Sequence, residues 1–392
     1  MQVTRIGIDI AKRQFEVHGV DERGTVVVRK SLKREQVSEF LAQLPRCEIG
    51  MEACGGAHYW HRELSKLGHT VRLLSAHKVK PYVVGNKNNR HDAAAICEAM
   101  SRPTMRFVEP KSPAQQDLQI LHRARALLLR ERTALSNQLR GVLHEYGIVM
   151  PLGAAALQRK VAEVLAGDDE RATSVLRTVI GEQLERFTYL SQRLAKYDRQ
   201  IAQFCHQDER CRRLLAVEGI GPLSATALVA TCGNGQEFQN GRHFSAYLGL
   251  VPGHSNTGNK TVMLGITKRG NRYLRTLLIH GGRAALYAAR RRSDPRSRWL
   301  KRLQERHCTN LAAVALANKN ARIAWALLRY GQEYCPTRAH AQTATSARTA
   351  RPAQSTPASA VHRARPVRSR THSSAAPSAH HEGRGERMLR KN

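Results

Sequence analysis

The segment VTRIGIDI, residues 3–10, is a β-branched run that reaches an acidic side chain, Asp9, as it ends. Two further strands are predicted at FEVHGVD (15–21) and TVVVRKS (25–31), joined by a turn at 21–24. Outward along the chain follow a predicted helix at 32–44, a strand at 47–52, a helix at 57–67 and a strand at 69–75. Three antiparallel strands followed by alternating helices and strands are typical of an RNase H-like α/β domain.

Three acidic residues occupy the ends of these predicted elements. Asp9 ends the first strand, Glu52 ends the fourth, and Asp92 begins a predicted helix at 93–100. If the strands pair as expected, the three carboxylates converge on one edge of the sheet, where they suit magnesium, which prefers hard oxygen ligands. The alternative is that each is an ordinary solvated acid, since Asp92 also suits a helix N-terminus.

The composition favours a polyanionic partner. The chain has 392 residues, a formal net charge of +33 and a pI of about 10.8, and nucleic acid is the first candidate for such a protein. An acidic membrane surface competes, but the chain has neither an apolar run of about 18 residues nor a signal peptide. Its eight cysteines form no C-x-x-C pair. We therefore expect a soluble intracellular protein with reduced thiols.

The middle of the chain is predicted to be helical. Long helices at 115–147 and 173–204 carry near-heptad apolar stripes, which indicate a helical hairpin or a coiled coil used for self-association. Residues 214–233 then place Gly219 and Gly221 between two short helices, as in a helix-hairpin-helix that offers backbone N–H groups to a phosphate. An ordinary helical turn is the alternative. Past Cys335 the chain is basic and poor in large apolar residues, so we expect a disordered tail.

A second candidate site lies in LGLVPGHSNTGNKTVMLGITKRGNRYLRTLLIHGGRAA, residues 248–285. Glycines and proline predict an exposed loop at 254–260, which carries the hydroxyls of Ser255 and Thr257. A helix at 271–289 should follow, with a mostly α fold around it. A hydroxyl beside many cations suits phosphoryl transfer; a structural loop before a basic surface helix is the alternative. The predicted phosphate-binding cations are Lys260, Lys268, Arg269, Arg272 and Arg275.

Several motifs together resemble the transposases of the insertion-sequence-110 type, including its 1111 subgroup. They are GIDIAK (7–12), MEACGGAHYW (51–60), VKPYVVGNKNNRHDAAAICEAMSRP (79–103), MRFVEPKS (105–112), EGIGPLSA (218–225), YLGLVP (247–252) and GNKTVMLGITKRGNRYLRTLLIHGGRA (258–284). The resemblance implies a RuvC-like DEDD domain and a C-terminal transposase domain with a nucleophilic serine. It also implies magnesium or manganese, element-end and target DNA, a structured guide RNA, a homo-oligomer (dimer or tetramer), no membrane, and a bacterial cytoplasmic, nucleoid-associated location.

Carried onto this sequence, the family pattern has two departures. Asp9, Glu52 and Asp92 match the first, second and fourth acids, but the third position holds Asn89, whose amide brings no charge to a metal. The serine position falls on Asn256 or Thr257, and the nearest serine is displaced to Ser255. An amide cannot be the nucleophile and threonine is more hindered, so Ser255 is the first choice and Thr257 the second.

These observations divide the chain into four predicted parts: a RuvC-like domain (1–110), a helical hairpin or coiled coil (113–206), a C-terminal transposase domain with the helix-hairpin-helix (207–335) and the tail (336–392). The predicted function is that of a DNA transposase or recombinase, guided by RNA, which attacks DNA with a hydroxyl. One alternative is a RuvC-like nuclease that uses metal alone. The other is a copy, inactivated at Asn89 and in the serine loop, that only binds nucleic acid.

Overall fold

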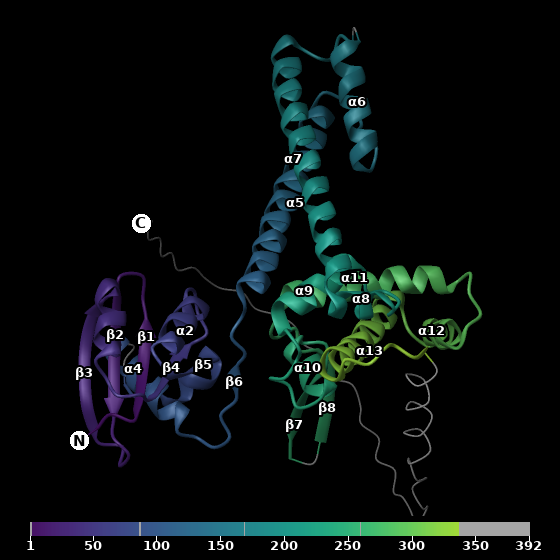
Figure 1. The fold of residues 1–392 in the computed structure, drawn as a ribbon. Coiled ribbons are helices and arrows are strands. Elements are labelled where there is room, and N and C mark those ends of the chain that lie inside the picture. The colour runs from purple at the N-terminus through teal and green to yellow at the C-terminus, as the bar shows by residue number, and fades with distance from the viewer. Residues whose placement is uncertain (1, 86–87, 168, 259, 337–392) are drawn as a thin grey trace, which may run out of the picture. The chain divides into compact units, whose positions relative to one another are not determined.

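The computed structural model describes residues 2–85, 88–167, 169–258 and 260–336, so the predicted tail lies almost entirely outside the described residues. The N-terminal part is a mixed sheet in the order β3-β2-β1-β4-β5-β6 (Figure 1). Its strands are β1 (Arg5–Ile10), β2 (Gln14–Val20), β3 (Val26–Lys33), β4 (Glu48–Glu52), β5 (Thr70–Leu74) and β6 (Phe107–Val108). All five predicted strands are confirmed, and only the short β6 was not predicted.

The direction of the strands follows the predicted pattern. β2 is antiparallel to β1 and to β3, whereas β4 is parallel to β1 and to β5. The helices between them are α1 (Val37–Ala42), α2 (Ala57–Lys66), α3 (Ala76–Val79) and α4 (Asn89–Met100), with short 3-10 turns at Arg34–Gln36 and Lys80–Tyr82. The helix predicted from residue 32 begins later because β3 continues to Lys33.

Helix α4 packs directly on the sheet because two strand positions carry no side chain. A Cβ added at Gly7 in β1 would lie 2.2 Å from the carbonyl oxygen of Ala93, and one at Gly50 in β4 would lie 1.9 Å from the sulfur of Met100. Both separations are far below van der Waals contact, so any larger residue would push the helix away. The glycines therefore fix how close α4 comes to β1 and β4.

The helical middle consists of α5 (Pro113–Glu145), α6 (Ala154–Ala166) and α7 (Ser174–Gln207), and α5 and α7 contact each other over part of their length (Figure 1). Most of the segment between the two predicted long helices is itself helical and forms α6. The apolar stripes of α5 and α7 share one buried cluster with α6, so much of the predicted seam is internal core. Arg125, which interrupts the α5 stripe, forms an ion pair with Asp198 of α7.

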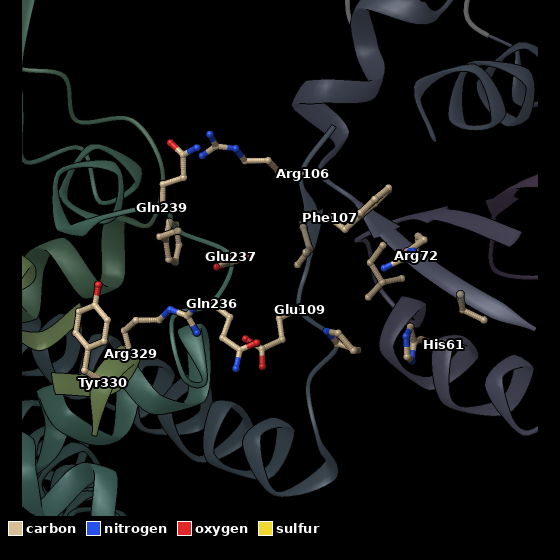
Figure 2. A pocket seen from close by; sticks show the side chains of 15 residues that line it. His61, Arg72, Arg106, Phe107, Glu109, Gln236, Glu237, Gln239, Arg329 and Tyr330 are labelled. Atoms are coloured by element: carbon tan, nitrogen blue, oxygen red, sulfur yellow. The ribbon is translucent and has the colours of Figure 1, made fainter. Parts of the chain in front are cut away.

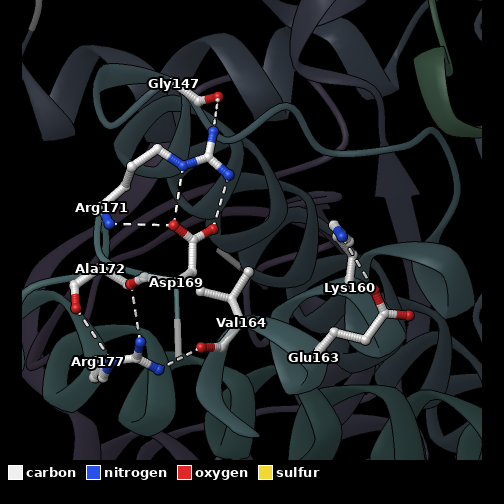
Figure 3. A network of polar contacts seen from close by, with 8 residues as sticks. All are labelled: Gly147, Lys160, Glu163, Val164, Asp169, Arg171, Ala172 and Arg177. Carbon is white, nitrogen blue, oxygen red and sulfur yellow. Dashed lines mark hydrogen bonds and ion pairs between the residues drawn. The ribbon is translucent and has the colours of Figure 1, made fainter. Parts of the chain in front are cut away.

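Two arginines stabilise the connection between α6 and α7 through hydrogen bonds (Figure 3). Arg177 donates hydrogen bonds to the carbonyl oxygens of Val164 and Ala172, at 2.5 and 3.0 Å. The first of these lies in the last turn of α6, where carbonyl groups lack helical partners. Arg171 donates to the carbonyl of Gly147 and to both carboxylate oxygens of Asp169, and this pairing lowers the pKa of that carboxyl to about 2.

The C-terminal part is mostly α, as predicted, with one small hairpin. It contains α8 (Glu209–Leu215), α9 (Pro222–Cys232), α10 (Gly241–Tyr247), β7 (Pro252–Thr257), β8 (Lys260–Ile266), α11 (Arg272–Ala289), α12 (Pro295–Arg306) and α13 (Thr309–Tyr330). The largest buried cluster gathers side chains from α7, α8, α9, α10, α11 and α13. His122 of α5 joins α9 and α11, because its ring nitrogens lie 3.0 Å from the Thr226 hydroxyl and 2.9 Å from that of Tyr273.

In the described part of the chain, every helix is too short or too polar to cross a lipid bilayer.

Candidate active site

The predicted acidic residues line one cavity of about 660 Å³. Asp9 is the next-to-last residue of β1 and Glu52 the last of β4, and because these strands are parallel neighbours, both carboxylates reach the same edge of the sheet. The predicted convergence is therefore confirmed, while the role as metal ligands stays a prediction. The lining residues are Asp9, Glu52, Ala76, Lys80, Val83, Gly85, Asn89 and Asp92.

The first turn of α4 supplies the other two polar residues of this cavity. Asn89 and Asp92 are three positions apart, so they lie on the same face of the helix. The capping role that could explain Asp92 belongs to Asn88, whose side-chain oxygen accepts a hydrogen bond from the backbone N–H of Arg90 at 3.2 Å. Asp92 is thus not the cap, but it lies in the first turn of α4, where an acid also suits the helix N-terminus.

Two neighbours of the acids were not predicted. Lys80 brings a cationic side chain into the cavity lining. Cys54 follows β4, and its pKa is raised by burial and further by the negative charges of Glu52 and Asp9. The thiol therefore lies within the field of both carboxylates. Both residues lie within the quoted motifs at 51–60 and 79–103, but the sequence assigned neither a role, because only the fold brings them beside the acids.

A divalent cation fits this cavity by the chemistry of its donors. Carboxylate oxygens from Asp9, Glu52 and Asp92, with the amide oxygen of Asn89, are the hard ligands that magnesium and manganese prefer. Their spacing is more open than a finished metal site: among the residues that the structure describes, no three His, Cys, Asp or Glu side chains are close enough to hold an ion.

The second candidate region is a β-hairpin, so the loop predicted at 254–260 is wrong. Thr257 pairs with Lys260, which leaves a two-residue connection that begins with Gly258, at φ 54°. A Gly-Asn connection between two paired segments is a strong hairpin signal. The glycines were interpreted as loop punctuation, although the residues on either side can pair as strands.

The hairpin register separates the candidate nucleophiles. Ser255 pairs with Val262, Asn256 with Thr261 and Thr257 with Lys260. Because side chains alternate along a strand, Ser255 and Thr257 lie on one face and Asn256 on the other. Both hydroxyl residues are exposed. The side chain of Lys260 lies outside the described part of the structure.

At the base of the hairpin, Arg275 is a structural residue. It is 8% exposed, and its Nη1 donates hydrogen bonds of 2.8 Å to the carbonyl oxygens of Leu248 and Arg269. The expectation that Arg275 faces solvent or ligand is therefore wrong. The cause is helix geometry, because Arg275 lies on the side of α11 that also carries the buried Leu278.

The chain segments that Arg275 joins are in direct backbone contact. A Cβ added at Gly270 would lie 1.7 Å from the carbonyl oxygen of Tyr247. The predicted cations Lys268, Arg269 and Arg272 are exposed beside this crossing, and none forms an ion pair with a described residue. Sequence reasoning thus placed these three correctly at the surface.

The Gly219–Gly221 turn connects α8 and α9. Gly219 has φ 83°, and a Cβ added there would lie 2.7 Å from the carbonyl oxygen of Gly281 in α11. The carbonyl of Glu218 accepts hydrogen bonds from Arg296 and Asn320, at 3.0 and 2.8 Å. Packing therefore explains Gly219, as the ordinary-turn alternative expected. Gly221 is exposed, and its phosphate-binding role stays a prediction.

A further cavity, of about 710 Å³, was not predicted (Figure 2). Its lining includes Glu109, from the segment before α5, and Glu237, from the segment after α9. Burial raises the pKa of both carboxyls, while the nearby Lys111 ammonium partly opposes the rise. Glu109 lies in the motif MRFVEPKS (105–112), whereas Glu237 lies in none of the quoted motifs, and only the fold brings the two together.

Comparison with known proteins relates two segments of the chain to transposases. Residues 6–148 match a family model described as "Transposase", and residues 211–299 match one described as "Transposase IS116/IS110/IS902 family". The chain is 50% identical over 337 residues to a "Probable family 20 transposase" of Pseudomonas aeruginosa, covering 86% of this chain and 100% of that one. It is 42% identical over 329 residues to the "Transposase for insertion sequence element IS1111A" of Coxiella burnetii, covering 84% and 90%.

Proposed function

Because the chain belongs to the IS116/IS110/IS902 family of insertion-sequence transposases, we propose that it cuts and rejoins DNA with a hydroxyl of the β7–β8 hairpin. Ser255 is the first choice of nucleophile and Thr257 the second. The observation that carries this choice is the hairpin register, which puts both hydroxyls on one exposed face. The amide of Asn256 points to the opposite face.

The chemistry is a phosphoryl transfer. The hydroxyl oxygen forms a bond to phosphorus, the bond from phosphorus to one sugar oxygen breaks, and that oxygen takes up a proton while the hydroxyl loses its own. A DNA hydroxyl then displaces the protein and completes the rejoined strand. Lys268, Arg269 and Arg272 would bind phosphates and stabilise charge on the non-bridging oxygens.

The acidic cavity would hold magnesium or manganese through Asp9, Glu52 and Asp92, with Asn89 as a neutral fourth donor. The bound ion would supply positive charge at a DNA phosphate. The strand order, with a parallel β1-β4-β5 core and antiparallel β2 and β3, supports an RNase H-like, RuvC-like domain at 1–110.

Two remaining parts of the proposal rest on sequence patterns: the helical segment 113–206 and a helix-hairpin-helix contact at Gly221. The others rest on the family resemblance: the transposase domain 207–335, a structured guide RNA, and a homo-oligomer acting on element ends and target DNA in the bacterial nucleoid.

The nucleophile is tested by trapping the protein on element-end DNA with the flanking RNA and magnesium, followed by a denaturing gel. We expect a covalent band that Ser255→Ala abolishes, whereas Asn256→Ala, on the other face, retains it. A band lost only in Thr257→Ala would transfer the role to Thr257. Metal-dependent cleavage that persists in both alanine variants without a covalent band would refute the hydroxyl mechanism and favour the metal-only nuclease.

The acidic cavity is tested with a matched pair of single-charge changes. Asn89→Asp adds a fourth acid to the cavity lining, at the position where the family pattern has its third acid, so we expect half-maximal cleavage at a lower magnesium concentration. Asn88→Asp adds the same charge one residue away and can still cap α4, but Asn88 does not line the cavity. Equal magnesium curves for the two variants would contradict the assignment. DNA binding without cleavage in wild type, Asn89→Asp and Thr257→Ser would indicate a copy that only binds.

A further inference from the structure

Helix α11 exposes one continuous polar row that leads away from the hairpin. Successive members are three or four residues apart, so at 100° per residue they fall within a sector of about 80°. The buried residues of α11, which include Leu274, Leu278 and Leu286, lie on the other side. The members of this α11 row, all exposed, are Arg272, Thr276, His280, Arg283, Tyr287 and Arg290.

The α11 row contains hydrogen-bond donors and positive charges but no acidic side chain. Each of its side chains can donate a hydrogen bond, and none is acidic. From Phe238 to Ser293 the chain contains no Asp or Glu at all, although a solvated helix surface is commonly stabilised by opposite charges four residues apart. Among the described residues, Arg283 bonds only the Asn310 side chain and Arg290 lies over the Tyr287 ring. The row therefore keeps its positive charge uncompensated.

The dimensions and composition fit a duplex. The 18 residues of α11 span about 27 Å, which corresponds to roughly 8 base pairs of DNA. Single-stranded nucleic acid is usually bound by a series of aromatic side chains on which bases stack, whereas the row has Tyr287 as its one Phe, Tyr or Trp and only His280 as a further ring. The row begins at Arg272, directly after the cations at the hairpin base, so phosphates bound there could continue along it.

We propose that the α11 row binds the phosphate backbone of duplex DNA that flanks the cleaved position, without reading its bases. This inference rests on the proposed function of the hairpin, from which it extends the contact with DNA. Arg283 and Arg290 are its new binding residues.

The test is a salt series of duplex-DNA binding without divalent metal. For Arg283→Gln/Arg290→Gln we expect the slope of log K against log salt to become shallower by about 2, because each lost phosphate contact changes it by about 0.9. The control is Arg159→Gln/Arg186→Gln, which removes the same charge from exposed positions on α6 and α7. It should keep the wild-type slope.

Equal slopes for the two double variants would overturn the proposal, since only total charge would then matter. A loss confined to an RNA duplex of the same sequence would also overturn it and assign the row to RNA. If only the catalytic proposal fails, the Ser255-dependent covalent band is absent, but the double variant and its control still differ in salt slope. The two failures can therefore be told apart. Far-UV circular dichroism confirms that the exposed substitutions leave the helices intact.

Discussion

Replacing two arginines of one helix should separate structural support from DNA binding. In Arg275→Met the aliphatic volume stays, but the carbonyls of Leu248 and Arg269 lose their donor. Leu248 is fully buried, so its unpaired carbonyl should cost about 1–3 kcal/mol, and loss of the hydrogen bond to the Arg269 carbonyl should cost a further amount of about 0.5–1.5 kcal/mol. The total is a loss of about 1.5–4.5 kcal/mol in the free energy of unfolding. Arg272→Met removes an exposed side chain and should change it by less than about 0.5 kcal/mol.

The assay pairs urea unfolding with DNA binding. Tryptophan fluorescence suits the unfolding measurement, because Trp325 lies in the same buried cluster as Leu248. We expect a lower urea midpoint for Arg275→Met only. DNA binding measured over a salt series should show the reverse, with a slope shallower by about 1 for Arg272→Met and a wild-type slope for folded Arg275→Met.

Two results would refute this reasoning. An Arg275→Met protein with wild-type stability would mean that the two carbonyl contacts contribute little. A shallower salt slope in the folded variant would mean that Arg275 reaches DNA after all, as the sequence alone had suggested.

Two further predictions concern packing and pH. Gly7→Ala should destabilise the N-terminal part by about 1–3 kcal/mol through overpacking against α4, and it should lower the rate of DNA cleavage. Gly55→Ala is the control, because no atom lies within 4 Å of its added Cβ, and it should have neither effect. Equal thermal midpoints for the two variants would contradict this prediction. Burial, aided by Arg125, lowers the pKa of His122 from 6.5 to about 4. The contribution of neutral His122 to the free energy of unfolding is therefore complete above pH 6.5 and falls as the pH drops towards 4. Wild type should lose about 2 kcal/mol more than His122→Gln between pH 7 and pH 5, and parallel urea-derived stabilities would exclude this role.

Local sequence patterns determined where the elements lie. The β-branched runs defined five strands because alternation and turn residues act over a few positions. The same runs located Asp9 and Glu52 at strand ends, and parallel pairing then predicted a shared edge. Asp92 was located from a predicted helix start at residue 93. That start was four residues late, because Asn88 caps α4 and the helix begins at Asn89.

The hairpin shows where local patterns were insufficient. Gly258 suggests a turn either in a loop or in a hairpin, and the choice between them decides which side chains share a face. Strand pairing resolved it, and Ser255 was thereby grouped with Thr257 and separated from Asn256. A spacing of one residue reverses the face in a strand, so counting along the sequence could not rank the three.

The sequence by itself determined the strands, the long helices, the acidic residues at the sheet edge and the cationic character of residues 248–285, because each depends on neighbours along the chain or on composition. Only the tertiary structure decided that α4 packs against Gly7 and that Gly219 packs against Gly281. It also decided that Arg275 is buried while Arg272 and Arg283 are exposed. These outcomes depend on which segments meet in space. An arginine has the same charge and propensity in either place, and burial with hydrogen-bond partners is what makes one structural and leaves the others for DNA.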